Sequence, residues 1–311
     1  RDEQTGASYQ HLRTNIEATL QRRMWHQNDP GVVPNLLITG AGAPTGILVY
    51  EGQLLPKVFR GQIIHAEPGR NMLWAFPTKQ VGAGYSAQIT EVLHSEVDLD
   101  FRPSDVSVAP DGSLFIADWF DPVDCCHRTI NDAGRIFRIA PPRHSYNPPS
   151  HDYSSPAGAI LALKNPNLST RYRAWTALLE MQSQARPLLE EMATDLNPRL
   201  RARALWLLAA FNDGTEQAVK LALGDCSDDV RALALRITRR HRLPIEPVVK
   251  QLVNDDSALV RRECAVSLYR LDSAAAIELW VELATQFDGQ DRWYLEALGI
   301  GQVGKETPCL A

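Results

Sequence analysis

The C-terminal half of the sequence repeats itself at a constant interval of 30 residues. Four segments align without gaps: LKNPNLSTRYRAWTALL, MATDLNPRLRARALWLL, LALGDCSDDVRALALRI and LVNDDSALVRRECAVSL. The alignment superimposes three sets of residues: Arg171, Arg201, Arg231 and Arg261; Asn165, Asp195, Asp225 and Asp255; and the small residues Ala174, Ala204, Ala234 and Cys264. Such a period is typical of proteins in which each repeat buries its apolar face against the next. The pattern predicts an α-solenoid of about five helical pairs over 157–302, beginning near 157, 185, 215, 245 and 273, with a tail at 303–311.

The repeated positions have structural explanations. The Asn or Asp is expected in the turn between two helices, where its side chain accepts the free N–H groups of a helix start. The Arg is expected to reach the turn acids of its own or the next repeat and so form a ladder, while the small residue permits close helix–helix approach. A fifth unit, DGQDRWYLEALGIG, carries Arg292 one residue out of register. We interpret the ladder as structural rather than as a binding site, and the basic run at 239–242 as a solvated helix end.

The N-terminal half has the pattern of antiparallel strands. Residues 31–140 contain short runs of Val, Ile, Phe, Tyr and Trp that alternate with polar residues and are broken by Gly, Pro and Asp-Gly. Asp111-Gly112 separates two such runs and predicts a hairpin turn. Apolar residues at three- and four-residue steps predict one amphipathic helix at 7–26, within an N-terminal segment 1–30. Residues 141–156 contain five prolines and are expected to form a linker.

Composition excludes several classes of function. The formal net charge of −5 gives no electrostatic support for binding nucleic acid or an anionic membrane. No apolar run approaches the ~20 residues of a membrane-spanning helix. Five cysteines are too few, and odd in number, for a disulfide framework. Cys226 and Cys264 are expected to be small buried thiols within helices. Because the chain begins at Arg1 rather than Met, we expect it to be a piece of a longer protein.

The stretch DWFDPVDCCHRT, from Asp118 to Thr129, gathers several reactive side chains. Covalent c-type haem requires two thiols separated by two residues before the axial His, whereas Cys125 and Cys126 are adjacent, so haem attachment is excluded. No second CxxC or HxH partner lies nearby, and the sequence therefore predicts no metal site here. The two thiols either form a vicinal disulfide in an oxidising compartment or remain free in a polar turn.

This loop leaves one predicted strand and enters the next, a position at which a rigid β scaffold often carries functional residues. Arg102 and Asp105, at the head of the preceding strand, are expected at the same end of the sheet. A cluster of Arg102, Asp105, Asp118, His127 and Arg128 would suit an anionic or polyhydroxylated ligand or cofactor, with His127 as general base and the other four as binding residues. The alternative is that Asp118 and Arg128 hold the loop together as a salt bridge.

Two stretches carry a resemblance to a known family: APTGILVYEGQLLPKVFRGQIIHAEPGRNMLWAF, and FRPSDVSVAPDGSLFIADWFDP followed by HR and GRIFRIAP. They resemble the last blades of the glucose/sorbosone dehydrogenase-like six-bladed propellers. With the repeats and the segment DRWYLEALGIG, nearly the whole chain is similar to the bacterial membrane-bound dehydrogenase (PVC-type haem-binding) family. The resemblance implies a multidomain β plus α fold, with a partial antiparallel β-propeller of about two blades at 31–140 followed by an α-solenoid of HEAT-like repeats. It also implies an extracytoplasmic or periplasmic location.

The cofactor pattern of the related sugar dehydrogenases is matched only in part. Arg102 matches one of their quinone-binding arginines, at the start of the RPSDV motif. Ser104 and Gly69 stand where the resemblance implies an arginine and a lysine, which disfavours pyrroloquinoline quinone. By the same resemblance, haem c belongs to a C-terminal domain of the parent protein that this sequence does not contain.

Two hypotheses of function follow. In the first, the chain is part of an extracytoplasmic sugar-dehydrogenase-like oxidoreductase, inactive as an isolated fragment, that binds a carbohydrate-type ligand while the solenoid holds a haem domain or a protein partner. In the second, it is a non-catalytic scaffold that binds protein or carbohydrate. The haem domain of the family favours the first hypothesis, and the two missing basic residues favour the second.

Overall fold

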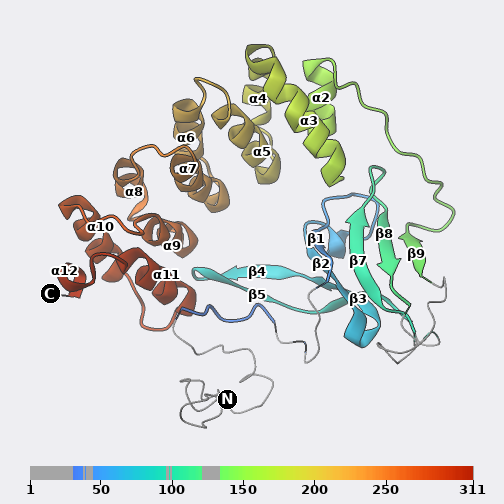
Figure 1. Ribbon diagram of the computed structural model, residues 1–311, viewed down its shortest axis with the longest axis horizontal. Helices are drawn as coiled ribbons and strands as arrows, with labels where there is room; N and C mark the ends of the chain where they lie inside the picture. The colour runs from blue at the N-terminus through green and yellow to red at the C-terminus, as the bar shows by residue number, and fades with distance from the viewer. Residues whose placement is uncertain are drawn as a thin grey trace, which may run out of the picture. The chain divides into compact units, whose positions relative to one another are not determined.

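The structure is a computed structural model that describes residues 31–37, 39, 45–95, 98, 100–120 and 134–310. It divides the chain into a sheet unit, Thr39–Lys79 with Ser86–Leu188, and a repeat unit, Arg1–Ile38 with Gln80–Tyr85 and Leu189–Ala311. Antiparallel strands occupy the N-terminal half and helices the C-terminal part, so the expected mixed β plus α chain is confirmed (Figure 1). The predicted helix at 7–26 and the cysteine pair at 125–126 lie outside the described residues.

The strands of the sheet unit form two larger antiparallel sheets. The first has the order β1-β2-β3-β6, made of β1 (Ile47–Val49), β2 (Ile63–Glu67), β3 (Met72–Phe76) and β6 (Thr90–His94). The second has the order β7-β8-β9, made of β7 (Pro103–Val108), β8 (Leu114–Asp118) and β9 (Arg135–Ile139). The turn at Asp111-Gly112 joins β7 to β8, with Gly112 at a φ of 88°, which confirms the predicted hairpin. A separate hairpin consists of β4 (Thr78–Val81) and β5 (Gly84–Ala87).

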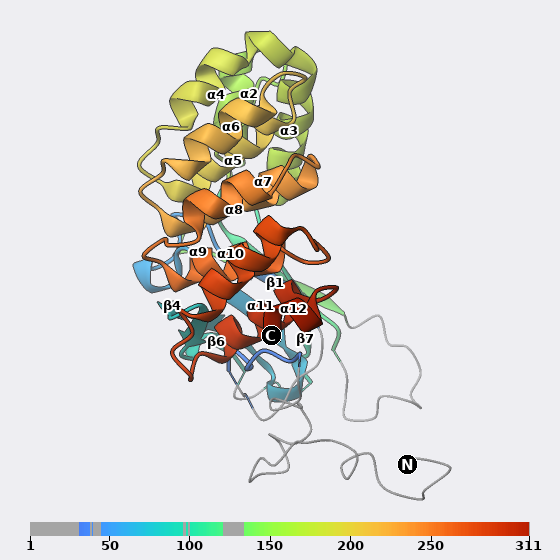
Figure 2. The same ribbon diagram turned by 90° about the vertical axis from the view of Figure 1, so that its left-hand side faces the viewer.

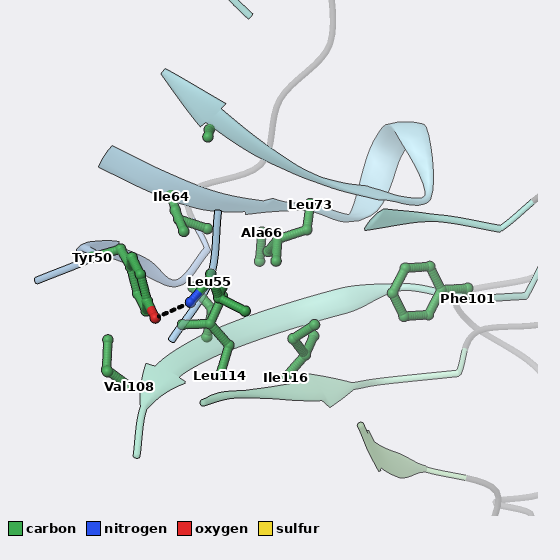
Figure 3. Close-up of a cluster of buried hydrophobic side chains, with 11 residues drawn as sticks. Tyr50, Leu55, Ile64, Ala66, Leu73, Phe101, Val108, Leu114 and Ile116 are labelled. Carbon is green, nitrogen blue, oxygen red and sulfur yellow. Dashed lines mark hydrogen bonds between the residues drawn. The ribbon is translucent and has the colours of Figure 1, made fainter. Parts of the chain in front are cut away.

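The two larger sheets share one hydrophobic core (Figure 3). Ile64 of β2 and Ile116 of β8 are both fully buried in it. Tyr50 is buried as well, and its hydroxyl donates to the Gly112 carbonyl at 2.7 Å and accepts the N–H of Leu55 at 2.9 Å. Burial of this ring raises the pKa of Tyr50. The core therefore ties the segment after β1 to the β7–β8 turn.

The first helix pair, α2 (Pro156–Leu163) and α3 (Leu168–Met181), belongs to the sheet unit. Asn167 caps α3 and donates to a main-chain carbonyl at the end of β7 at 2.6 Å. Asn165, in the turn before it, donates to a carbonyl of the β7–β8 turn at 3.0 Å. Arg171 pairs with a glutamate that follows β1. The first repeat is thus bonded to the sheets by Asn165 and Arg171, which belong to the repeated sets, and by the helix cap Asn167.

Four further helix pairs and a short last helix follow. They are α4 (Arg186–Met192), α5 (Pro198–Ala209), α6 (Thr215–Leu223), α7 (Asp228–Arg240), α8 (Glu246–Leu252), α9 (Ala258–Ser267), α10 (Ala274–Ala284), α11 (Arg292–Gln302) and α12 (Glu306–Leu310). The first helices of the five pairs begin within one residue of the predicted positions, which confirms the register of the repeat. Figure 2 shows α5 to α11 as successive rows of the repeat unit. None of the helices in the described part of the chain is both long and apolar enough to cross a bilayer.

The predicted ladder is present at two steps of the repeat unit. Nε and Nη2 of Arg201 donate to the two carboxylate oxygens of Asp225 at 2.7 and 2.6 Å, and Arg231 binds Asp255 in the same way at 2.6 and 2.8 Å. Nη1 of each arginine donates to a carbonyl of its own turn, at 2.9 and 3.1 Å. The next arginine, Arg261, meets no acid one repeat further on and lies 5.8 Å from the centroid of an aromatic ring of α11 instead. The small residues of the third set are all fully buried: Ala174, Ala204, Ala234 and Cys264.

One expectation for the repeats is wrong. Cys226 is exposed, because the register places it in the turn before α7 rather than inside the helix. Cys264 is buried in α9 as expected, and desolvation raises the pKa of its thiol. The basic run at 239–242 lies at the end of α7 and is largely exposed, as expected, and Arg239 also pairs with the carboxylate of Glu263, which is 7% exposed.

Candidate functional site

Asp118 is the last residue of β8, and its side chain is completely buried at 0% exposure. Its Oδ1 accepts the main-chain N–H groups of Arg102 at 2.7 Å and Phe120 at 3.0 Å. Its Oδ2 accepts Nε and Nη2 of Arg135 at 2.8 and 2.5 Å. Both carboxylate oxygens are therefore engaged in holding the ends of neighbouring strands together.

Arg135, the first residue of β9, joins Asp118 to a second carboxylate. Its Nη1 lies 2.5 Å from Asp98, and its guanidinium lies 4.7 Å from the ring centroid of Phe120 and 5.2 Å from that of Phe137. The bond to Asp98, with a further contribution from Asp118, raises the pKa of Arg135. The bond from Arg135 lowers the pKa of Asp98 in turn. Asp98 and Arg135 therefore both stay charged at neutral pH.

A pocket of about 240 Å³ opens beside this ion pair. It is lined by Leu93, His94, Ser95, Asp98, Phe101, Arg135 and Phe137. The rings of Phe101 and Phe137 meet edge-on with centroids 5.7 Å apart and supply an apolar surface, while Asp98 and Arg135 supply a charged edge. The volume is slightly below the ~300–1,000 Å³ of most ligand pockets. The arrangement can bind a small molecule that presents both a hydrocarbon face and hydrogen-bonding groups.

The structure does not bring all described members of the predicted cluster together. Arg102 contributes its main-chain N–H to Asp118, and its Nη1 donates to the carbonyl of the preceding residue at 3.0 Å. Asp105 pairs with Ala117 across the sheet, and neighbouring residues of a strand point to opposite faces, so Asp105 lies on the face opposite to Asp118. It is exposed there and accepts the N–H of the next residue at 2.8 Å. A β-bulge after Pro103 shifts the alternation along this strand.

His127 and Arg128 lie outside the described residues, so the general base and its neighbour stay predictions. In the described part of the chain, Asp118 pairs with Arg135, and its expected pairing with Arg128 stays a prediction. Sequence reasoning missed both Arg135 and Asp98. A signal for Arg135 existed: the sequence ends one strand with an acid and begins the next with a base, and the two residues face each other directly in the sheet.

The described ranges contain few acidic and sulfur- or imidazole-bearing side chains that lie close together. There, no group of three or more His, Cys, Asp and Glu side chains is placed to hold a metal ion.

Comparison with known proteins identifies a domain in the N-terminal half. Residues 6–142 match the model of a domain of unknown function (DUF7133). This range contains both larger antiparallel sheets and every residue of the predicted cluster. No curated protein matches the chain. The fold and the comparison together describe a chain with a sheet unit, part of which is similar to this domain, and a unit of repeated helix pairs.

Proposed function

We propose that this chain is the scaffold part of an extracytoplasmic protein of the glucose/sorbosone dehydrogenase-like type. In this proposal the two larger sheets are blades of a β-propeller and the helix pairs are HEAT-like repeats. The repeats hold a partner protein or a redox domain, and the chain itself performs no catalytic step. The family resemblance of the sequence supports the type of parent protein, and the side-chain chemistry supports the scaffold role.

The observation that carries the scaffold role is the pair of buried ladder bonds in the repeat unit. The side chains of Arg201 and Asp225 are 9% and 8% exposed and meet through two hydrogen bonds. Two parallel bonds fix direction as well as distance, so they fix the rotation of one repeat relative to the next. A surface that is rigid before binding loses little conformational entropy when a partner docks, which favours its use as a docking platform.

The charged side chains of the sheet unit also support a scaffold role, because they bind other groups of the protein. Both carboxylate oxygens of Asp118 accept hydrogen bonds from the ends of neighbouring strands, and Arg135 binds two carboxylates. A general base needs an oxygen or nitrogen free to accept a proton from the substrate. Within the predicted cluster, Asp118 therefore has a structural role. A catalytic role would depend on His127 and Arg128, which lie outside the described residues.

A photo-crosslinking experiment tests the scaffold proposal. Leu196, in the turn before α5, is 98% exposed, and a benzophenone amino acid placed there samples the surface of the repeats. Ile136 of β9 is 75% exposed and provides a matched position on the sheet unit. We expect a discrete cross-linked partner at Leu196 and none at Ile136 in cells that express the parent protein. Sugar-dependent dye reduction by the purified chain with added pyrroloquinoline quinone would overturn the proposal in favour of an oxidoreductase.

A second candidate function is binding of a carbohydrate-type ligand in the 240 Å³ pocket. It is favoured by the aromatic surface of Phe101 and Phe137 next to the charged edge, because sugars present both apolar C–H faces and hydroxyl groups. Titration calorimetry with common monosaccharides tests it, with Asp98→Asn as the variant that removes one acceptor from the pocket edge. Binding that the variant weakens would support the candidate, and heat of dilution alone with every sugar would reject it.

A further inference from the structure

The repeat unit contains an open cleft of about 530 Å³. One side consists of the turns that precede α7 and α9, with Cys226, Asp228 and Ser257, and the other consists of Gln80 and Gly82 at the tip of the β4–β5 hairpin. Ser257 Oγ donates to Asp228 Oδ2 at 2.8 Å, and Gln80 Nε2 donates to Ser257 Oγ at 3.4 Å. The tip of the hairpin therefore forms a wall of the cleft and is bonded to the opposite side.

Two side chains hold the main chain of Ala83 at this tip. Asp291 Oδ2 accepts its N–H at 2.6 Å, and Nη1 of Arg262 donates to its carbonyl oxygen. Ala83 itself is fully buried. Asp291 also caps α11, because its Oδ1 accepts the N–H of Tyr294 at 3.1 Å. One carboxylate thus serves the helix and the hairpin through separate oxygens.

Glycines on both sides of the docked alanine permit this close approach. Gly82 has a φ of 56°, and a Cβ added to it would lie 2.3 Å from an oxygen of Asp291. A Cβ added to Gly84 would lie 2.1 Å from the ring of Trp293. Tyr85 meets the same ring edge-on, with centroids 6.2 Å apart. The contact is made by main-chain groups of the hairpin and requires residues without side chains at 82 and 84. A larger residue at either glycine is therefore not accommodated in this position.

The two strands of the hairpin bury few of their residues. All four residues of β4 are exposed, and Gly84 is the one buried residue of β5. A two-stranded hairpin without a buried face is at best marginally stable in water. Its order therefore depends on the contacts at the tip. Such a segment opens at a lower free energy than the packed helices on which it lies.

We propose that the hairpin tip, residues 80–85, is a releasable strap that closes one side of the cleft in the repeat unit. When the tip is docked, Gln80 and Gly82 line the cleft. When it is released, the turns before α7 and α9 are open on that side. A molecule that fills the cleft and contacts the docked tip shifts the equilibrium towards the closed form, because it binds that form better.

Hydrogen exchange of the full chain, read by mass spectrometry, tests the strap with variants that act from its two sides. Gly84→Ala acts from the hairpin. Asp291→Asn acts from the helix, since it leaves one acceptor oxygen where two are needed and Asn is itself a good helix cap. Gly299→Ala is the control in the same helix, because an added Cβ meets no atom within 4 Å there. The rate at which a bulky maleimide alkylates Cys226, an exposed thiol in the cleft, reports the opening of the wall.

We expect the amides of residues 80–85 to exchange roughly tenfold faster or more in both variants, with α11 still protected after Gly84→Ala. Alkylation of Cys226 should accelerate in parallel, and Gly299→Ala should accelerate neither the exchange of residues 80–85 nor the alkylation of Cys226. Unchanged exchange of the tip in both variants would show that these contacts do not hold it. Faster exchange of α11 together with the tip after Gly84→Ala would show that the tip is an integral part of the helix packing. Unchanged alkylation of Cys226 would show that the tip does not close the cleft. Each of these three results would overturn the proposal.

Discussion

Replacing Asp118 by Asn removes the charge that binds Arg135 but keeps the size and shape of the side chain. The remaining oxygen can still accept the N–H groups of Arg102 and Phe120, which bond to Oδ1 at 2.7 and 3.0 Å. The amide nitrogen that replaces Oδ2 is a donor and would face two further donors, Nε and Nη2 of Arg135. Asp118→Asn therefore loses the two charge-assisted bonds and leaves the backbone bonds in place.

The loss of stability in Asp118→Asn depends on how deeply Asp118 and Arg135 are each buried. Removal of one partner from a buried ion pair costs ~3–5 kcal/mol because the other charge is left uncompensated. Here the Asp118 side chain is 0% exposed, whereas that of Arg135 is 34% exposed and keeps its bond to Asp98. Solvent and the second carboxylate reduce the penalty, so we expect a loss of ~2–3 kcal/mol for opening of this part of the sheet. Asp98→Asn removes the other bond of the same arginine at a more exposed site and should cost much less.

Hydrogen exchange of peptides that cover β8 and β9 measures this difference locally, which is preferable in a chain of two units whose unfolding need not be a single transition. A loss of ~2–3 kcal/mol corresponds to exchange that is about 30- to 150-fold faster. Asp98→Asn is the matched control, and Arg135→Met in the Asp118→Asn background should add little further acceleration. If Asp118→Asn accelerated exchange of β8 no more than Asp98→Asn does, the buried pair would not be what holds these strand ends.

Three further predictions concern the repeat unit. Arg201→Ala should destabilise it by ~3 kcal/mol in urea denaturation followed by circular dichroism, because a nearly buried carboxylate loses its bidentate partner. In thermal unfolding, Gly301→Ala should destabilise, since its Cβ would lie 2.4 Å from a carbonyl oxygen of α9, whereas Gly299→Ala should stabilise by ~1 kcal/mol. Burial pushes the pKa of Asp225 and Asp255 upward, but the bonds from the ladder arginines and the turn N–H groups outweigh it, and the pKa of both is lowered. Their contribution to stability is therefore present above the unfolded pKa of ~3.9 and lost as the pH falls through the folded pKa, so a urea midpoint that stays constant below about pH 4 would contradict it.

The helix pairs could be predicted closely because every element of the repeat is a local signal. The Asn or Asp marks the turn, the small residue marks the helix contact, and the constant spacing averages out errors at single positions. Cys226 shows the limit of the pattern, since one position decides whether a residue lies in the turn or in the helix. Arg261 shows another limit, because the residue one repeat after Asp255 is Thr285 and the arginine turns to an aromatic ring instead.

The site could not be predicted to the same degree because its geometry depends on pairing between strands. The β-bulge after Pro103 determines the face of the sheet on which Asp105 lies, and no residue in the sequence predicts this bulge. The pairing of Asp118 with Arg135 likewise depends on the register of β8 against β9, which aligns the two residues. An alternating pattern that predicts strands therefore does not predict which side chains become neighbours.

The same use of an aspartate recurs in both units and bears on how charged residues of this chain should be interpreted. At each place, Oδ1 accepts the main-chain N–H two residues further on, at 2.7 to 3.0 Å, and the carboxylate also binds a guanidinium. The pairs are Asp111–Arg138, Asp118–Arg135, Asp225–Arg201 and Asp255–Arg231. One carboxylate thus satisfies the free N–H of a turn, and the arginine offsets the cost of burying its charge. In this arrangement both carboxylate oxygens already accept hydrogen bonds from the protein. An Asp–Arg pair in this chain therefore indicates a structural role, and ligand contacts should be sought at polar groups outside these pairs.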